Sequence, residues 1–229
     1  MSASSRDLHE VVALRVANEI GRRTDVLAVM VGGSVARGDH VASSDVDLVV
    51  VTSDDAQLAT SERSLVEWIA RTESAWLLRF DRPKTSWLYA FLDVRIVMDT
   101  GPAARLCTAA KSMLSTYRTS AAQRELLATW LWHGQAKLDR ARANGDPAVK
   151  GFHAALFVET LLDGLYAVHD VPLPAGARLL EHIHRVPLTA RERQLLDSIL
   201  TGDTQRRFGA ICDLATDLRE QLGPPDHGA

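Results

Sequence analysis

The spacing of apolar residues changes several times along the first half of the chain, and each spacing predicts a different element. Residues 8–23 repeat apolar positions at the three- and four-residue intervals of a helix. Residues 26–31 are an uninterrupted, β-branched run that stops at two glycines, which predicts a buried strand. A tight turn into a short helix is expected over 33–38, and a second strand over 45–52.

The following segment is expected to continue the alternation of helices and strands. Residues 62–73 carry apolar side chains at helical spacing and are predicted to form a helix. Residues 75–80 and 86–98 are interpreted as strands on either side of a turn that contains a proline. Together these elements predict an α/β domain with a mixed sheet of about four or five strands.

After residue 101 the strand signals stop and helical periodicity takes over. Helices are predicted over residues 103–117, 121–142, 148–169, 176–185, 190–200 and 204–222. Strands with helices, followed by helices alone, indicate an α/β head and an all-helical bundle domain. We place the two domains at 1–115 and 116–229, with the boundary between residues 101 and 120.

Composition and charge narrow the classes of function. Of the 229 residues, 46% are apolar and 24% charged, the balance of a soluble globular protein. The net charge of −3 argues against a nucleic-acid binder, which is usually basic. Residues 151–229 contain 7 Lys and Arg against 11 Asp and Glu, which is explained either by attraction of a cationic partner or by a solvated helical surface.

The location predicted from the sequence is the cytoplasm. The first residues lack an apolar secretory core, and no uninterrupted apolar run is long enough to cross a bilayer. The two cysteines, Cys107 and Cys212, lie in apolar helical patterns without the spacing of a zinc site, as expected of reduced thiols in a protein core.

A glycine-rich bend follows the first predicted strand. Gly32 and Gly33 end the strand and can bring bare backbone N–H groups close to an anion. Ser34 adds a hydroxyl at the start of a short helix, where unpaired amides favour phosphate. Arg37 lies one turn further on and could hold a phosphate, although an exposed helical arginine is an equally simple interpretation.

Paired carboxylates follow on the second predicted strand. Asp45 and Asp47 are two residues apart, so the alternation of a strand points both to one face. Such carboxylates repel each other and stay charged most easily by sharing a divalent cation, and an all-oxygen site suits Mg²⁺. Asp93 is expected in the middle of a third strand, where it can complete a site for two ions. Asp81, at a turn, and Asp99, at a strand end, are its rivals.

This pattern resembles the nucleotidyltransferase superfamily with the DNA polymerase β-like palm. The resemblance is carried by Gly33 and the serine after it, ten intervening residues, Asp45 and Asp47, and more loosely by the segment around Asp93. The form Gly-Ser-Val-Ala-Arg-Gly followed by Ser-Asp-Val-Asp-Leu looks like the bacterial branch. That branch includes minimal nucleotidyltransferases and the aminoglycoside and lincosamide adenylyltransferases.

The resemblance implies a reaction and a set of site residues. A substrate hydroxyl would attack the α-phosphorus of a nucleoside triphosphate, so that AMP is transferred from ATP and pyrophosphate leaves. The implied residues are Gly33, Ser34 and Arg37 toward the triphosphate, and Asp45, Asp47 and Asp93 toward two Mg²⁺ ions.

The helical half is expected to supply the acceptor side, with the acceptor in the cleft between the two halves. Glu159 stands among apolar residues on a helix that is expected to be partly buried, which makes it the candidate general base. A plain solvent-facing glutamate is the alternative. Asp163, one turn further on, could help to hold a cationic substrate, with the same alternative.

The identity of the acceptor stays open. The preferred interpretation is a hydroxyl of a small molecule, such as an aminoglycoside- or lincosamide-like antibiotic, and a cationic acceptor would suit the acidic half. One alternative is a macromolecular acceptor, a protein or a transfer RNA, in a toxin–antitoxin-like system. The other is a non-catalytic nucleotide-binding module. The charge distribution counts against RNA, and the intact aspartates count against a degenerate site.

Overall fold

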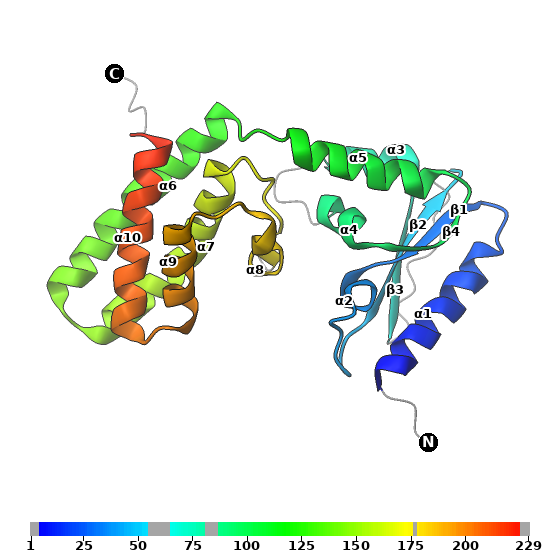
Figure 1. Cartoon of the computed structure of the whole chain (residues 1–229), viewed down its shortest axis with the longest axis horizontal. Helices are drawn as coiled ribbons and strands as arrows, with labels where there is room; N and C mark the ends of the chain where they lie inside the picture. The colour runs from blue at the N-terminus through cyan, green and yellow to red at the C-terminus, as the bar shows by residue number, and fades with distance from the viewer. Residues whose placement is uncertain (1–4, 55–64, 81–86, 176–177, 225–229) are drawn as a thin grey trace. The chain divides into compact units, whose positions relative to one another are not determined.

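The computed structural model describes residues 5–54, 65–80, 87–175 and 178–224. The chain divides into two compact units, residues 1–116 and 117–229. In chain order, the elements of the first unit are α1 (Ser5–Gly21), β1 (Val26–Val31), α2 (Gly33–Arg37), β2 (Val46–Thr52), β3 (Val66–Thr72), α3 (Glu73–Phe80), α4 (Trp87–Asp93), β4 (Arg95–Asp99) and α5 (Pro102–Thr116) (Figure 1).

The strands of this unit form one four-stranded sheet in the order β3-β2-β1-β4. Strand β1 pairs antiparallel with β2 and β4, whereas β2 and β3 run parallel. Both faces of β1 are buried: Val29 and Val31 belong to the cluster beneath α1, while Ala28 and Met30, on the other face, are also 0% exposed. Burial on two faces explains why this strand is a continuous apolar run instead of an alternation.

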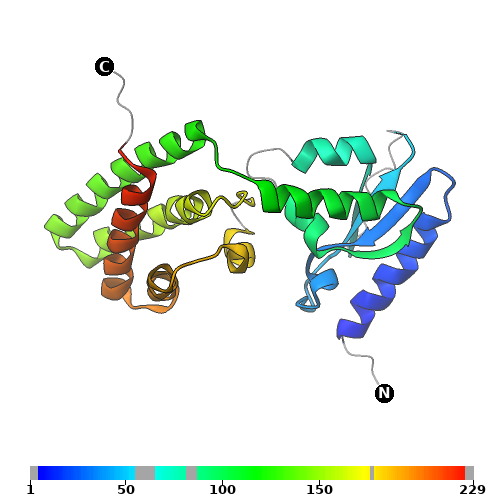
Figure 2. The same cartoon turned by 45° about the horizontal axis from the view of Figure 1, so that its top comes forward.

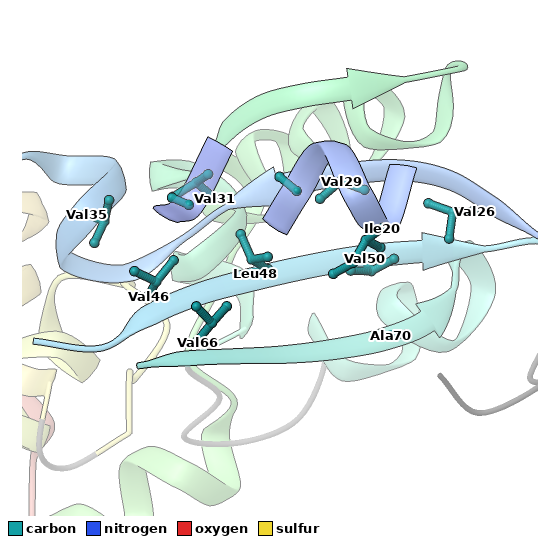
Figure 3. Packing of buried hydrophobic residues seen from close by; sticks show 12 residues of the cluster. Ile20, Val26, Val29, Val31, Val35, Val46, Leu48, Val50, Val66 and Ala70 are labelled. Carbon is teal, nitrogen blue, oxygen red and sulfur yellow. The ribbon is translucent and has the colours of Figure 1, made fainter. Parts of the chain in front are cut away.

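Helix α1 lies across one face of the sheet. Its apolar positions Ala13, Ala17 and Ile20 recur at helical spacing and belong to one cluster with the valines of β1 and β2. Figure 3 shows Ile20 beside Val50 in this cluster. Figure 3 also shows Val46 and Leu48 of β2 in this cluster, each 2% exposed or less. Full burial of one such side chain contributes about 1.5–3 kcal/mol, so the cluster fixes the direction of β2 and the side chains on its other face.

The predicted helix over 62–73 is wrong. Its described part contains β3, in which Val66, Trp68 and Ala70 alternate toward the α1 cluster. The same apolar positions fit a helical repeat almost as well, and pairing with β2 along seven consecutive residues decides for the strand.

The strands predicted at 75–80 and 86–98 also need correction. Residues 73–80 form helix α3, in which Trp76 and Phe80, four residues apart, are both buried. The indole Nε1 of Trp76 donates a hydrogen bond to the Val50 carbonyl (3.0 Å) and so ties α3 to β2. The second segment divides into helix α4 and strand β4, and only β4 pairs with β1.

The second unit is all helical, as the sequence predicts. Its elements are α6 (Ala121–Asn144), α7 (Pro147–Val168), α8 (Leu179–His182), the 3-10 turn η2 (Ile183–Arg185), α9 (Ala190–Thr201) and α10 (Thr204–Leu222). A side-chain N-cap begins each of the helices α6, α7, α9 and α10. The capping side chains accept a hydrogen bond from a backbone N–H, and they are Ser120, Asp146, Thr189 and Asp203. Within the predicted helix over 176–185, residues 176 and 177 lie outside the described part.

Helix α7 is the core of this unit. Among the described helices it alone is long and apolar enough to cross a membrane by length and composition, with a mean hydropathy of 1.2. Leu161, Leu165 and Tyr166 are nevertheless at most 1% exposed, because α6 and α10 pack along α7 (Figures 1 and 2). The apolar character of α7 is therefore that of a buried helix in a bundle.

Candidate active site

The bend between β1 and α2 is built around the next strand. Gly32 N donates a hydrogen bond to the Asp47 carbonyl (2.8 Å), which extends the antiparallel pairing of β1 and β2 by one step. Gly33 has a φ of +59°, and a Cβ there would overlap the Asp47 Oδ2 atom. Glycine is therefore required at residue 33 twice over, by the backbone and by the carboxylate that lies against its Cα.

Three carboxylates meet at the beginning of β2 and β3. Oxygen atoms of Asp45, Asp47 and Glu67 all lie within 4.8 Å of one another. Asp45 directly precedes β2, and Asp47 is paired with Glu67 in the parallel register. Side chains of adjacent strands in direct register lie on the same face of the sheet, which brings Glu67 beside the aspartates.

The charge of this group suits a divalent cation. Asp45 and Glu67 are exposed and Asp47 is half-buried. Three carboxylates this close repel one another, and a shared cation removes the repulsion. The donor set consists of oxygen atoms only and is open to solvent on one side. Such a donor set is consistent with a divalent cation that prefers oxygen ligands.

The carboxylate group differs in one member from the expected set. Asp45 and Asp47 come together as predicted, but the third member is Glu67, which sequence reasoning missed because residues 62–73 were interpreted as a helix. The signal available was the alternation of Val66 and Trp68 around Glu67.

Asp93 does not belong to this group. It is the last residue of α4, so the prediction that it stands in the middle of a strand is wrong. Of its two rivals, Asp81 lies outside the described residues, and Asp99 caps α5. The Asp99 carboxylate accepts hydrogen bonds of 2.8–3.0 Å from the backbone N–H groups of Gly101, Ala103 and Ala104.

Ser34 and Arg37, the other residues predicted to contact the triphosphate, follow Gly33 in α2. Ser34 is half-buried in the first turn of α2, and its carbonyl accepts a bond from the Asp39 N–H (3.1 Å). Arg37 ends α2, and its Nε donates to Asp39 Oδ2 (3.2 Å). The guanidinium thus already has a carboxylate partner, as a surface arginine often does. Gly38, with a φ of +77°, then closes the helix.

The two acidic residues predicted in the helical half differ in burial. Glu159 is exposed on α7, so the expectation that it is partly buried is wrong. Asp163 is 2% exposed on the same helix, in the interior of the unit. A general-base role for Glu159 stays a prediction, whereas the burial of Asp163 leaves it little surface with which to hold a substrate.

Comparisons with known proteins bear on the first unit. Residues 14–91 match the family model described as Nucleotidyltransferase domain, and this match includes Gly33, Asp45, Asp47 and Glu67. No curated protein matches the sequence significantly.

A solved structure is similar over most of the chain. It is a nucleotidyltransferase-like protein from Exiguobacterium sibiricum, with 12% identity, a TM-score of 0.43, and coverage of 93% of this chain and 74% of that one. The assignment of the first unit to a family rests on the match over residues 14–91. Residues 14–91 of this chain therefore belong to a nucleotidyltransferase domain of the DNA polymerase β-like superfamily.

Proposed function

We propose that this protein is an adenylyltransferase that moves AMP from ATP to a hydroxyl group of a small molecule and releases pyrophosphate. The observation that carries the proposal is the Asp45, Asp47 and Glu67 group beside the Gly33 bend. The bend offers backbone N–H groups to an anion, and the carboxylates suit a cation that would bind the same anion.

The proposed roles divide between the carboxylates and the bend. Asp45, Asp47 and Glu67 would hold Mg²⁺, which when bound neutralises negative charge on the triphosphate. Gly33 and Ser34 would contact the phosphates. The main contribution of these site residues would be to hold the α-phosphorus in line with the acceptor oxygen and to stabilise the charge that develops as the bond breaks.

Arg37 would assist the triphosphate once it exchanges Asp39 for a phosphate oxygen. Arg37 is half-buried and Asp39 is exposed, and an ion pair this close to solvent contributes about 0–1 kcal/mol, which a contact to phosphate can replace.

The chemical step is a substitution at phosphorus. The acceptor oxygen forms a bond to the α-phosphorus, the bond from the α-phosphorus to the bridging oxygen breaks, and pyrophosphate leaves with the electron pair. The acceptor hydroxyl must lose its proton, and we propose the Glu159 carboxylate as the group that takes it. Its exposure on α7 leaves the carboxylate accessible to a substrate.

The acceptor is proposed by class only. Residues 151–229 have an excess of carboxylates, which favours a cationic acceptor such as an amino sugar. No comparison supports a role in antibiotic resistance, so the aminoglycoside and lincosamide classes serve here as probes.

The test is a pyrophosphate-release assay with each of the four nucleoside triphosphates, Mg²⁺ and separate panels of aminoglycosides, lincosamides, proteins and transfer RNA. We expect release with ATP and a small-molecule acceptor, and its loss by a factor of about 10² or more in Asp47→Asn and Glu67→Gln. Asp54→Asn is the matched control, because Asp54 is exposed just beyond the opposite end of β2.

Three outcomes would contradict parts of the proposal. Full turnover by Asp47→Asn would remove the metal role of this group. A loss in Asp93→Asn equal to that in Glu67→Gln would restore Asp93 as a ligand. Turnover only with a protein or transfer RNA would replace the small-molecule acceptor by a macromolecular one.

A further inference from the structure

Helix α1 carries a buried histidine that reaches the loop in front of the carboxylate group. His9 is 2% exposed, although it stands only about one turn from the N-terminal end of its helix. Its Nε2 atom lies 2.9 Å from the Ser44 carbonyl oxygen, 35 residues away in sequence. A carbonyl oxygen can only accept, so His9 Nε2 carries the proton and donates it to Ser44.

The loop that accepts this hydrogen bond forms a turn, which two hydrogen bonds between Val41 and Ser44 close. Ser44 N donates to the Val41 carbonyl, and Val41 N donates to Ser44 Oγ, both at 2.9 Å. His40, from the same loop, is 8% exposed, and its ring centroid lies 5.1 Å from that of His9. The His9–Ser44 hydrogen bond and the His9–His40 ring contact therefore both join α1 to the loop that leads into Asp45.

Asp45 depends on this turn more than the other two carboxylates do. Asp47 and Glu67 stand inside paired strands, and their register fixes the distance between them. Asp45 precedes the first residue of β2 and is exposed, so the sheet constrains it only from its C-terminal side. On its N-terminal side the neighbouring peptide carbonyl is the one that His9 binds.

We propose that His9 is a positioning residue, which holds the Ser44 peptide so that Asp45 faces Asp47 and Glu67 at a distance suited to a shared divalent cation. This inference depends on the proposed function, because it needs the carboxylate group to bind a cation. Groups that position ligands in this way typically change metal affinity by about 10- to 100-fold when they are removed.

The experiment measures Mn²⁺ binding by electron paramagnetic resonance, beside the Mn²⁺ dependence of pyrophosphate release and a thermal unfolding curve. We expect His9→Leu to weaken Mn²⁺ binding about tenfold or more, with kcat largely recovered at saturating Mn²⁺. His9→Gln should stay close to wild type, because its side-chain amide can donate to the same carbonyl. A generally destabilised protein would not show this rescue.

Glu10→Gln is the matched control on the same helix. Glu10 forms a two-point ion pair with Arg95 and so ties α1 to β4, at the edge of the sheet away from β3. Its loss should lower the unfolding temperature without a change in Mn²⁺ affinity. Ser44→Ala offers a second route if His9→Leu does not fold, since it opens the turn at a half-buried side chain and should also weaken Mn²⁺ binding.

The outcomes separate the two proposals. A wild-type protein that binds no Mn²⁺ overturns the proposed function, and this inference with it. Wild-type binding together with unchanged affinity in His9→Leu and Ser44→Ala overturns the positioning role alone. So does a His9→Gln variant as weak as His9→Leu, or an equal loss of affinity in Glu10→Gln.

Discussion

Replacement of Gly33 by alanine tests the contact between the bend and the carboxylate group. The backbone at residue 33 has a φ of +59°, where a residue with a Cβ loses about 1–2 kcal/mol. The added Cβ would also overlap Asp47 Oδ2, and overpacking of this kind typically destabilises by about 1–3 kcal/mol more. We therefore expect Gly33→Ala to lose about 2–5 kcal/mol, or to relieve part of that loss by moving the Asp47 side chain.

Gly38→Ala measures the backbone contribution alone, so its difference from Gly33→Ala gives the contribution of the overlap with Asp47. Gly38 has a similar φ of +77°, but a Cβ there would have no atom within 4 Å, so only the backbone loss of about 1–2 kcal/mol applies. At about 4 °C per kcal/mol, the two variants should differ clearly in unfolding temperature. Mn²⁺ titration supplies the second measurement, and only Gly33→Ala should lose affinity. Equal unfolding temperatures together with equal Mn²⁺ affinities in the two variants would refute the claim that Asp47 lies against Gly33.

Two further predictions concern the helical unit. Burial raises the pKa of Glu192, but hydrogen bonds from Thr189, the N-cap of α9, and from His169 (2.9 Å) outweigh it and leave the pKa lowered. The resulting stability is present above the ordinary glutamate pKa and is lost as pH falls. Between about pH 5 and pH 3, wild type should therefore lose more unfolding free energy than Glu192→Gln. Urea unfolding measures both free energies, and an equal loss in the two proteins would contradict the prediction. Gly134→Ala would drive a Cβ into the Phe157 ring and should destabilise the protein by about 1–3 kcal/mol. Gly209→Ala, where an added Cβ meets open space, should stabilise it by about 0.5–1 kcal/mol. Thermal unfolding of both variants checks the difference in sign.

Local patterns in the sequence were sufficient for most of the fold. The long helices of the second unit begin at side-chain caps and repeat apolar positions at helical spacing, and both signals come from neighbouring residues. Strands β1 and β2 were equally clear, because a β-branched run bounded by glycine or polar residues is typical of a strand. The pair Asp45 and Asp47 followed from the alternation of β2 alone.

The elements that were predicted wrongly, within residues 62–73, 75–80 and 86–98, are short ones with non-local partners. Residues 66–72 fit the helical and the strand repeat alike, and they become β3 because each pairs in parallel with a β2 residue 20 positions earlier in the chain. Residues 73–80 become a helix because Trp76 and Phe80 must face one core together. A single segment does not contain this information, since it resides in the partner that the segment packs against.

The candidate site shows the same division. The sequence by itself determined the glycine bend and the two aspartates, because a bend and an adjacent strand are set by residues close together in the chain. Tertiary structure decided the third carboxylate, since Glu67 joins the group only through its register with Asp47. It also decided the environment of His9, whose hydrogen bond to Ser44 spans 35 residues. Spacing along the chain specifies the face of a strand on which a side chain lies, whereas its neighbours across the sheet depend on which strands pair and in what register.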